Sequence, residues 1–124
     1  MPAKILICDN EEPLRALVRA ALAAGDYDLV EARDGDEALA LARETHPDLL
    51  VLDMMMPGRT GLEVLQEVRR DPALARARVL ILTARAQAED RDAAAAEGAD
   101  AYVSKPFSPL ELAHVVDELL QHSR

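Results

Sequence analysis

Five polar residues lie at or just beyond the ends of short apolar runs, and together their side chains could hold a phosphoryl group. They are Asp9, Asn10, Asp53, Thr83 and Lys105. Clustered carboxylates repel one another unless a cation lies between them, and oxygen ligands of this kind suit a hard divalent ion, Mg²⁺ or Mn²⁺. A lysine adds a fixed positive charge, and a threonine adds a hydroxyl donor. One carboxylate, one metal ion, one lysine and one hydroxyl are suitable parts for phosphoryl chemistry.

Asp53 abruptly ends a run of branched apolar residues and precedes a Met-Pro-Gly turn. Residues 49–52 have no polar alternation, which is typical of a strand covered on both faces in a parallel sheet. Open α/β sheets bind their ligands at the C-terminal edge of such strands. From this stretch alone, Asp53 is a reactive group, a metal ligand or the first polar residue after the core.

The polar residues can meet only if the chain folds so that its strand ends converge. We predict strands over residues 4–8, 28–32, 49–52, 79–82 and 101–103. Each is followed by a helical pattern, and these patterns cover about 13–25, 35–43, 61–70, 88–97 and 109–120. Five strand-then-helix repeats imply parallel strands with right-handed crossovers. We therefore predict an α/β fold, a single-domain doubly wound sheet with helices on both faces.

Composition bounds the class of protein. A chain of 124 residues is expected to form one domain with a genuine core. A net charge of −9 and only three aromatic residues make the chain poorly suited to bind the phosphate backbone of a nucleic acid. We expect no direct nucleic-acid binding. A single cysteine, Cys8, excludes a disulfide framework and indicates a reducing cytoplasm. No apolar run reaches the roughly 18 residues of a membrane span, so we expect a cytoplasmic protein with no membrane contact.

Four motifs resemble the receiver domain of two-component response regulators, the family that includes small chemotaxis-type regulators. They are KILICDNEEPLR, PDLLVLDMMMPGRTGLE, VLILTA and GADAYVSKPF, in that order along the chain. The resemblance implies one receiver domain over residues 1–124, with a flavodoxin-like fold of strand order 2-1-3-4-5 and five helices. It also implies a phosphorylation-dependent switch in a phosphorelay. Such a domain catalyses its own phosphorylation and dephosphorylation and is not an enzyme acting on a separate substrate.

The resemblance implies a partner at each end of the signal. A sensor histidine kinase or a phosphotransfer protein would supply the phosphoryl group, and a downstream protein or an output domain would receive the signal. Asp53 would be the phosphate acceptor. Asp9, Asn10, Asp53 and the backbone carbonyl of Met55 would hold Mg²⁺ or Mn²⁺.

Three further residues receive roles from the same resemblance. Thr83 would be the switch hydroxyl, Tyr102 the aromatic switch residue and Lys105 the phosphate contact, with a cis peptide bond before Pro106. Without the motifs, Thr83 is also an ordinary strand-ending β-former and Lys105 an ordinary surface lysine.

Asn10 departs from the family pattern, because this position is usually a second carboxylate and a direct metal ligand. An amide oxygen can still coordinate Mg²⁺, but the site loses one negative charge. A receiver-like binding module that works without phosphorylation is therefore an alternative. A phosphatase of the haloacid dehalogenase kind is a weaker one, because its second aspartate would fall on Met55.

Overall fold

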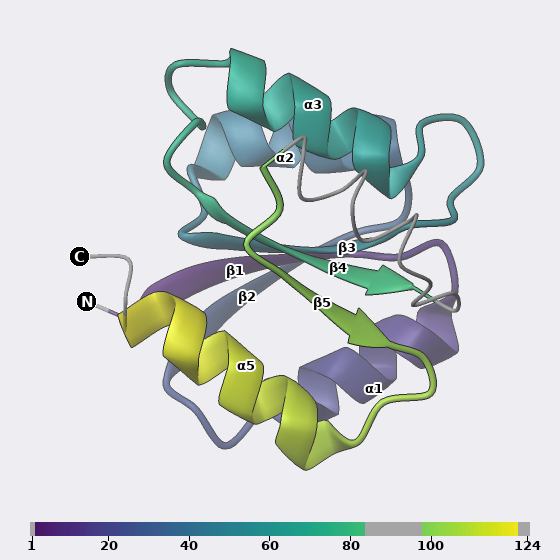
Figure 1. Ribbon diagram of the computed structural model, residues 1–124, viewed down its shortest axis with the longest axis vertical. Helices are drawn as coiled ribbons and strands as arrows, with labels where there is room; N and C mark the ends of the chain where they lie inside the picture. The colour runs from purple at the N-terminus through teal and green to yellow at the C-terminus, as the bar shows by residue number, and fades with distance from the viewer. Residues whose placement is uncertain (1, 84–97, 122–124) are drawn as a thin grey trace.

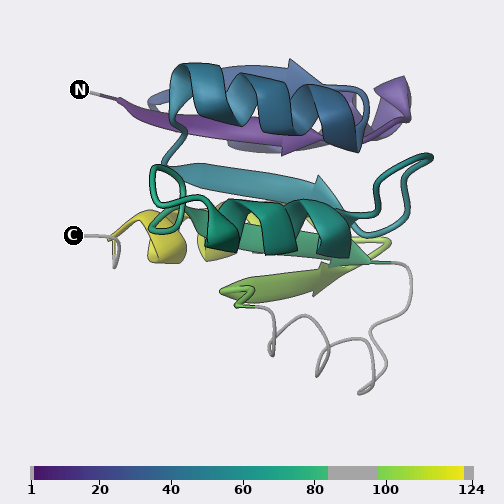
Figure 2. The ribbon, with the colours of Figure 1, turned by 90° about the horizontal axis from the view of Figure 1, so that it is seen from above.

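A five-stranded parallel sheet lies between two layers of helices in the computed structural model, which describes residues 2–83 and 98–121 (Figure 1). The strands are β1 (Ala3–Cys8), β2 (Tyr27–Ala32), β3 (Leu49–Asp53), β4 (Arg78–Thr83) and β5 (Ala101–Ser104). They pair in the order β2-β1-β3-β4-β5, and every pairing is parallel. Seen from above, all five arrows point the same way (Figure 2). The predicted α/β fold and strand order 2-1-3-4-5 are confirmed.

Helices cover both faces of the sheet. They are α1 (Glu12–Leu22), α2 (Gly35–Thr45), α3 (Gly61–Arg70) and α5 (Pro109–Gln121). The pair α1 and α5 covers one face, and α2 with α3 covers the other (Figure 1). The helix predicted over 88–97 lies outside the described residues. None of the helices within the described ranges has the length and hydropathy to cross a membrane.

Side-chain caps fix where two helices begin. Asp34 accepts a hydrogen bond from the backbone N–H of Glu37 at the start of α2. At α3, Thr60 and Glu63 form a reciprocal capping box, which satisfies backbone donors that the first helical turn leaves unpaired. Because Thr60 follows the loop after Asp53, this cap also sets where that loop ends.

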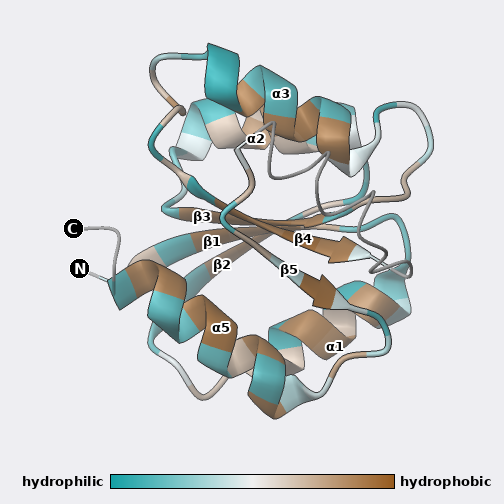
Figure 3. Ribbon diagram, in the orientation of Figure 1, coloured by the Kyte–Doolittle hydropathy of each residue, from teal (hydrophilic) through white to brown (hydrophobic). Residues whose placement is uncertain are grey.

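The sheet separates two hydrophobic cores, and β3 contributes to both. All five residues of β3 are buried. Leu50 and Leu52 pack toward α2 and α3, whereas Leu49 and Val51 pack toward α1 and α5. Apolar residues are concentrated in the strands in the middle of the molecule, and polar residues lie on the outer faces of the helices (Figure 3). This two-sided burial explains why the strand sequence has no polar alternation.

The carboxylate of Asp100 fixes the start of β5. It accepts hydrogen bonds from the backbone N–H of Val79, at 2.8 Å, and from the guanidinium groups of Arg69, at 2.9 Å, and Arg78, at 3.3 Å. Arg69 also donates to the carbonyl oxygen of Gly98. These contacts join α3, β4 and β5 at the edge opposite to the strand ends that carry the predicted site.

Candidate functional site

Two carboxylates and one ammonium group meet at the C-terminal edge of the sheet. The Nζ atom of Lys105 lies 3.0 Å from Oδ1 of Asp53 and 3.7 Å from Oδ2 of Asp9. Asp9 and Asp53 are only 1% and 2% exposed. Buried carboxylates are strongly attracted to any nearby cation, because little water screens the interaction. The structure thus brings together three residues that are widely separated in the sequence.

Backbone hydrogen bonds just beyond the strands hold these residues in place. The N–H of Asp9 donates to Ala32 at 3.2 Å, the N–H of Met54 to Leu82 at 2.8 Å, and the N–H of Lys105 to Thr83 at 2.8 Å. Each bond extends the sheet pairing past a strand end. The polar side chains therefore stand on backbone that the sheet has already fixed. The Lys105-Pro106 peptide bond is cis, as predicted.

Asp9 carries negative charge that its neighbours only partly offset. Its Oδ1 atom accepts a hydrogen bond from the N–H of Glu11 at 2.9 Å. Its Oδ2 atom is buried and has no hydrogen-bond partner within the described residues, although the Lys105 ammonium lies within ion-pair range. Burial raises the pKa of Asp9 above its ordinary value, and the charge of Asp53 adds to that rise, while the Glu11 N–H and Lys105 oppose it. A further cation would relieve this repulsion.

The oxygens at this edge fit a hard divalent cation. Asp9 and Asp53 supply two carboxylates, and no group of three His, Cys, Asp or Glu side chains suited to a metal occurs in residues 2–83 and 98–121. Further oxygens would have to come from the exposed Asn10 amide and the Met55 carbonyl. The Met55 N–H donates to Oδ1 of Asp53 at 3.2 Å, so this loop already folds around the carboxylate. An all-oxygen donor set is the one that Mg²⁺ prefers.

The two predicted switch residues lie on neighbouring strands. Thr83 is buried at the end of β4, where it is paired in register with Ser104. Tyr102 is half-buried on β5 and packs against the core under α2 and α3. The register places Tyr102 opposite Ile81, two positions before the Thr83 pair. The structure thus places Thr83 beside the backbone of Lys105, and Tyr102 two residues earlier in the same strand pair.

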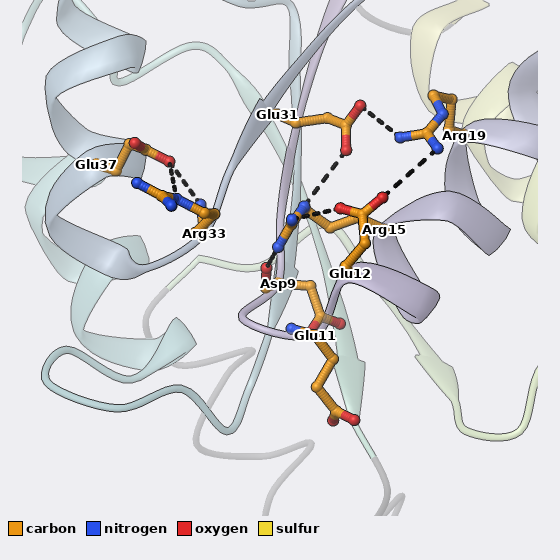
Figure 4. A network of polar contacts seen from close by, with 8 residues as sticks. All are labelled: Asp9, Glu11, Glu12, Arg15, Arg19, Glu31, Arg33 and Glu37. Atoms are coloured by element: carbon orange, nitrogen blue, oxygen red, sulfur yellow. Dashed lines mark hydrogen bonds and ion pairs between the residues drawn. The ribbon is translucent and has the colours of Figure 1, made fainter.

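One buried residue at the site was missed by the sequence prediction. Arg15 is 7% exposed, and its Nη1 atom donates to the backbone carbonyl of Asp9 at 2.6 Å (Figure 4). The helical spacing of the sequence indicates this burial, because Arg15 precedes Val18 by three residues and Leu22 by seven and so shares their buried face of α1. A charged side chain, however, is ordinarily expected at an exposed position.

Comparisons with known protein families and with individual proteins agree on one family. The sequence model of the family "response regulator receiver domain" matches residues 5–117 of this chain. The chain is 39% identical to the phosphate regulon transcriptional regulatory protein PhoB of Escherichia coli K12 over 112 residues, which cover 90% of this chain and 49% of that protein. It is also 39% identical to the transcriptional regulatory protein ResD of Bacillus subtilis over 120 residues, or 97% of this chain and 49% of that protein. The chain thus spans about half the length of these curated relatives.

A solved structure agrees with this result. The chemotaxis response regulator CheY4 of Vibrio cholerae superimposes with a TM-score of 0.91 at 31% identity, and the match covers 96% of this chain and 99% of that one.

Proposed function

The chain belongs to the response regulator receiver domains of two-component systems, and we propose that it acts as a phosphorylation-dependent signalling switch. The observation that carries the proposal is the meeting of Asp9, Asp53 and Lys105 at one buried sheet edge, with Lys105 3.0 Å from the Asp53 carboxylate. A buried carboxylate with a cation beside it is suited to accept a phosphoryl group.

In the proposed reaction, Asp53 attacks the phosphorus of a phosphohistidine on a sensor kinase or phosphotransfer protein. A P–O bond to Asp53 forms as the P–N bond breaks, and the leaving imidazole takes up a proton. Lys105 offsets the negative charge on the transferring oxygens, which is the main task of a protein in such a transfer. The chain thereby catalyses its own phosphorylation and does not act on a separate substrate.

Receiver domains in general bind Mg²⁺ for phosphorylation, and we propose the same for this chain. Asp9, Asp53, the Asn10 amide and the Met55 carbonyl would hold the ion. When bound there, Mg²⁺ or Mn²⁺ supplies positive charge to the phosphoryl oxygens. The buried Oδ2 atom of Asp9, which accepts no hydrogen bond from the described residues, supports this assignment.

We further propose that Thr83 and Tyr102 transmit the change. A phosphoryl group on Asp53 would hydrogen-bond the Thr83 hydroxyl, and Tyr102 would then turn toward the space that the hydroxyl leaves. The surface formed by β5 and α5 would change as a result, in a two-state element biased by local charge. A downstream protein or an output domain would sense that surface, and no direct nucleic-acid contact by this chain is needed.

The assignment of the acceptor can be tested by mass spectrometry of the intact chain. Acetyl phosphate with Mg²⁺ should add one phosphate, and Asp53→Asn should prevent the addition. Asp28→Asn is a matched control, because Asp28 is an exposed carboxylate on β2. Phosphate found on the Asp53→Asn chain would contradict the proposal.

Asn10 supports a second candidate, a binding module that works without phosphorylation. The exposed amide leaves the site with two acidic side chains rather than three. This candidate predicts a folded chain with no Mg²⁺-dependent phosphate and a partner that binds regardless. The leading proposal instead predicts that Asn10→Asp tightens Mg²⁺ binding and speeds phosphorylation. Unchanged Mg²⁺ affinity in Asn10→Asp would show that the missing charge does not limit the site.

A further inference from the structure

A network of charged side chains contacts the backbone carbonyl of Asp9 (Figure 4). Arg15 donates from Nη1 to the Asp9 carbonyl at 2.6 Å, from Nε to Glu31 at 3.3 Å and from Nη2 to Glu12 at 2.5 Å. Glu31 stands on β2 and also accepts a hydrogen bond from Arg19 at 2.7 Å. The network therefore links α1, β2 and the end of β1.

The Asp9 carbonyl belongs to the peptide group that joins Asp9 to Asn10. A peptide group is planar, so a hydrogen bond to its oxygen orients the α-carbons of both residues. On its other side, the Asp9 N–H is held by the carbonyl of Ala32 at 3.2 Å. The backbone that leads to both proposed metal ligands is thus fixed by two contacts, and one of them is Arg15.

We propose that Arg15, held in place by Glu31, is a positioning residue for the metal site of this chain. The inference rests on the proposed function, because it concerns the Mg²⁺ that this function requires. Arg15 itself binds the backbone carbonyl of Asp9 and is not one of the proposed metal ligands. Its role is to keep the Asp9–Asn10 peptide in an orientation from which the Asp9 carboxylate and the Asn10 amide could bind the ion together with Asp53.

The chemistry of arginine explains why this residue type stands here. Three donors of one planar guanidinium reach a carbonyl and two carboxylates in three directions. A lysine ammonium has a single nitrogen and lacks this fixed fork. Arg15→Lys should therefore keep the charge balance with Glu12 and Glu31 but hold the peptide less firmly.

The direction in which metal affinity changes when Arg15 is replaced separates a positioning role from a purely electrostatic one. A positive charge near a metal site repels a divalent cation, so a purely electrostatic role for Arg15 predicts tighter metal binding when the charge is removed. A positioning role predicts weaker binding, because the ligands lose their orientation. Residues that orient metal ligands typically contribute about tenfold or more to metal affinity.

The test measures Mn²⁺ binding to the full chain by electron paramagnetic resonance, which detects the free ion, with thermal unfolding followed by circular dichroism. We expect Arg15→Gln to bind Mn²⁺ about tenfold more weakly than the wild-type chain. Arg15→Lys should have the thermal stability of the wild-type chain but only part of its Mn²⁺ affinity. Arg19→Gln is the matched control, because it removes the same charge from the same network and leaves the Asp9 contact in place. Its Mn²⁺ affinity should stay at the wild-type value or rise slightly.

Three results would overturn the inference. The first is wild-type or tighter Mn²⁺ binding by a folded Arg15→Gln chain. The second is an equal loss of affinity in Arg15→Gln and Arg19→Gln, which would indicate a general charge effect. The third is a wild-type chain that binds no Mn²⁺, and only this result would also overturn the metal-dependent function proposed above.

Discussion

Replacing Gly61 with alanine is expected to destabilise the fold and to slow the proposed phosphorylation of Asp53. Gly61 is the first residue of α3 and is buried directly behind the end of β3. A Cβ atom added there would lie 2.4 Å from the carbonyl oxygen of Asp53 and 3.0 Å from the α-carbon of Met54. Both neighbours are backbone atoms, so no side-chain rotation can relieve the clash.

The size of the effect follows from the distance. An ordinary contact begins at 3.4 Å, so the helix start and the Asp53 backbone must separate by about 1 Å. Overpacking of this kind costs about 1–3 kcal/mol, and the better helix propensity of alanine offsets at most about 1 kcal/mol. With a central overpacking cost of about 2 kcal/mol, a net loss of about 1–2 kcal/mol should remain. Displacing a reacting group by about 1 Å can slow a reaction about a hundredfold.

Urea unfolding and the rate of phosphorylation by acetyl phosphate measure the two effects separately. Gly58→Ala is the control, because Gly58 lies in the same loop and an added Cβ would meet no atom within 4 Å. Its φ of 76° makes alanine unfavourable there, so some stability is lost without pressure on Asp53. Wild-type stability and phosphorylation rate in Gly61→Ala would refute the reasoning.

Three other changes give independent tests. Lys105→Met should tighten Mg²⁺ binding, because it removes the cation that competes for Asp9 and Asp53. The same change should slow phosphorylation about a hundredfold. Weaker Mg²⁺ binding measured by calorimetry would contradict this expectation. Burial raises the pKa of Cys8 to about 12 from 9.0, so the stability that its neutral thiol contributes is complete below about pH 9 and is lost as the pH rises through 12. The free energy of unfolding should fall more steeply over that interval than in Cys8→Ala, and iodoacetamide should label Cys8 at pH 8 only after unfolding. Leu112→Ala should cost about 2–5 kcal/mol in urea unfolding while the folded fraction is still phosphorylated, and a loss below 1 kcal/mol would argue against full burial.

Local signals made most of the fold predictable from the sequence. The cap residues Asp34 and Thr60 act within four residues, so their effect on α2 and α3 can be inferred without the tertiary structure. The uninterrupted apolar run before Asp53 indicated a strand buried on both faces, and β3 is such a strand. Parallel topology then predicted that Asp9, Asp53 and Lys105 would meet, and they do.

Contacts that depend on side-chain direction across elements could not be predicted in this way. Arg15 on α1 donates to the Asp9 carbonyl at the end of β1, and residue spacing does not show which partner a buried arginine will have. The Arg69–Asp100 pair joins residues 31 positions apart. The roles of Thr83 and Tyr102 stay predictions, because they concern a change of state.

The position of β3 within the sheet has a consequence for how the molecule can respond. β3 pairs with a strand on each side, whereas the four-residue β5 lies at the edge and pairs with β4 alone. Amide hydrogens of a central buried strand exchange with solvent only when the whole domain unfolds, and those of a short edge strand exchange through local opening. We therefore expect the amides of β3, which carries Asp53, to exchange more slowly than those of β5, which precedes Lys105. If Asp53 is phosphorylated as proposed, hydrogen exchange should change in β5 and stay nearly the same in β3.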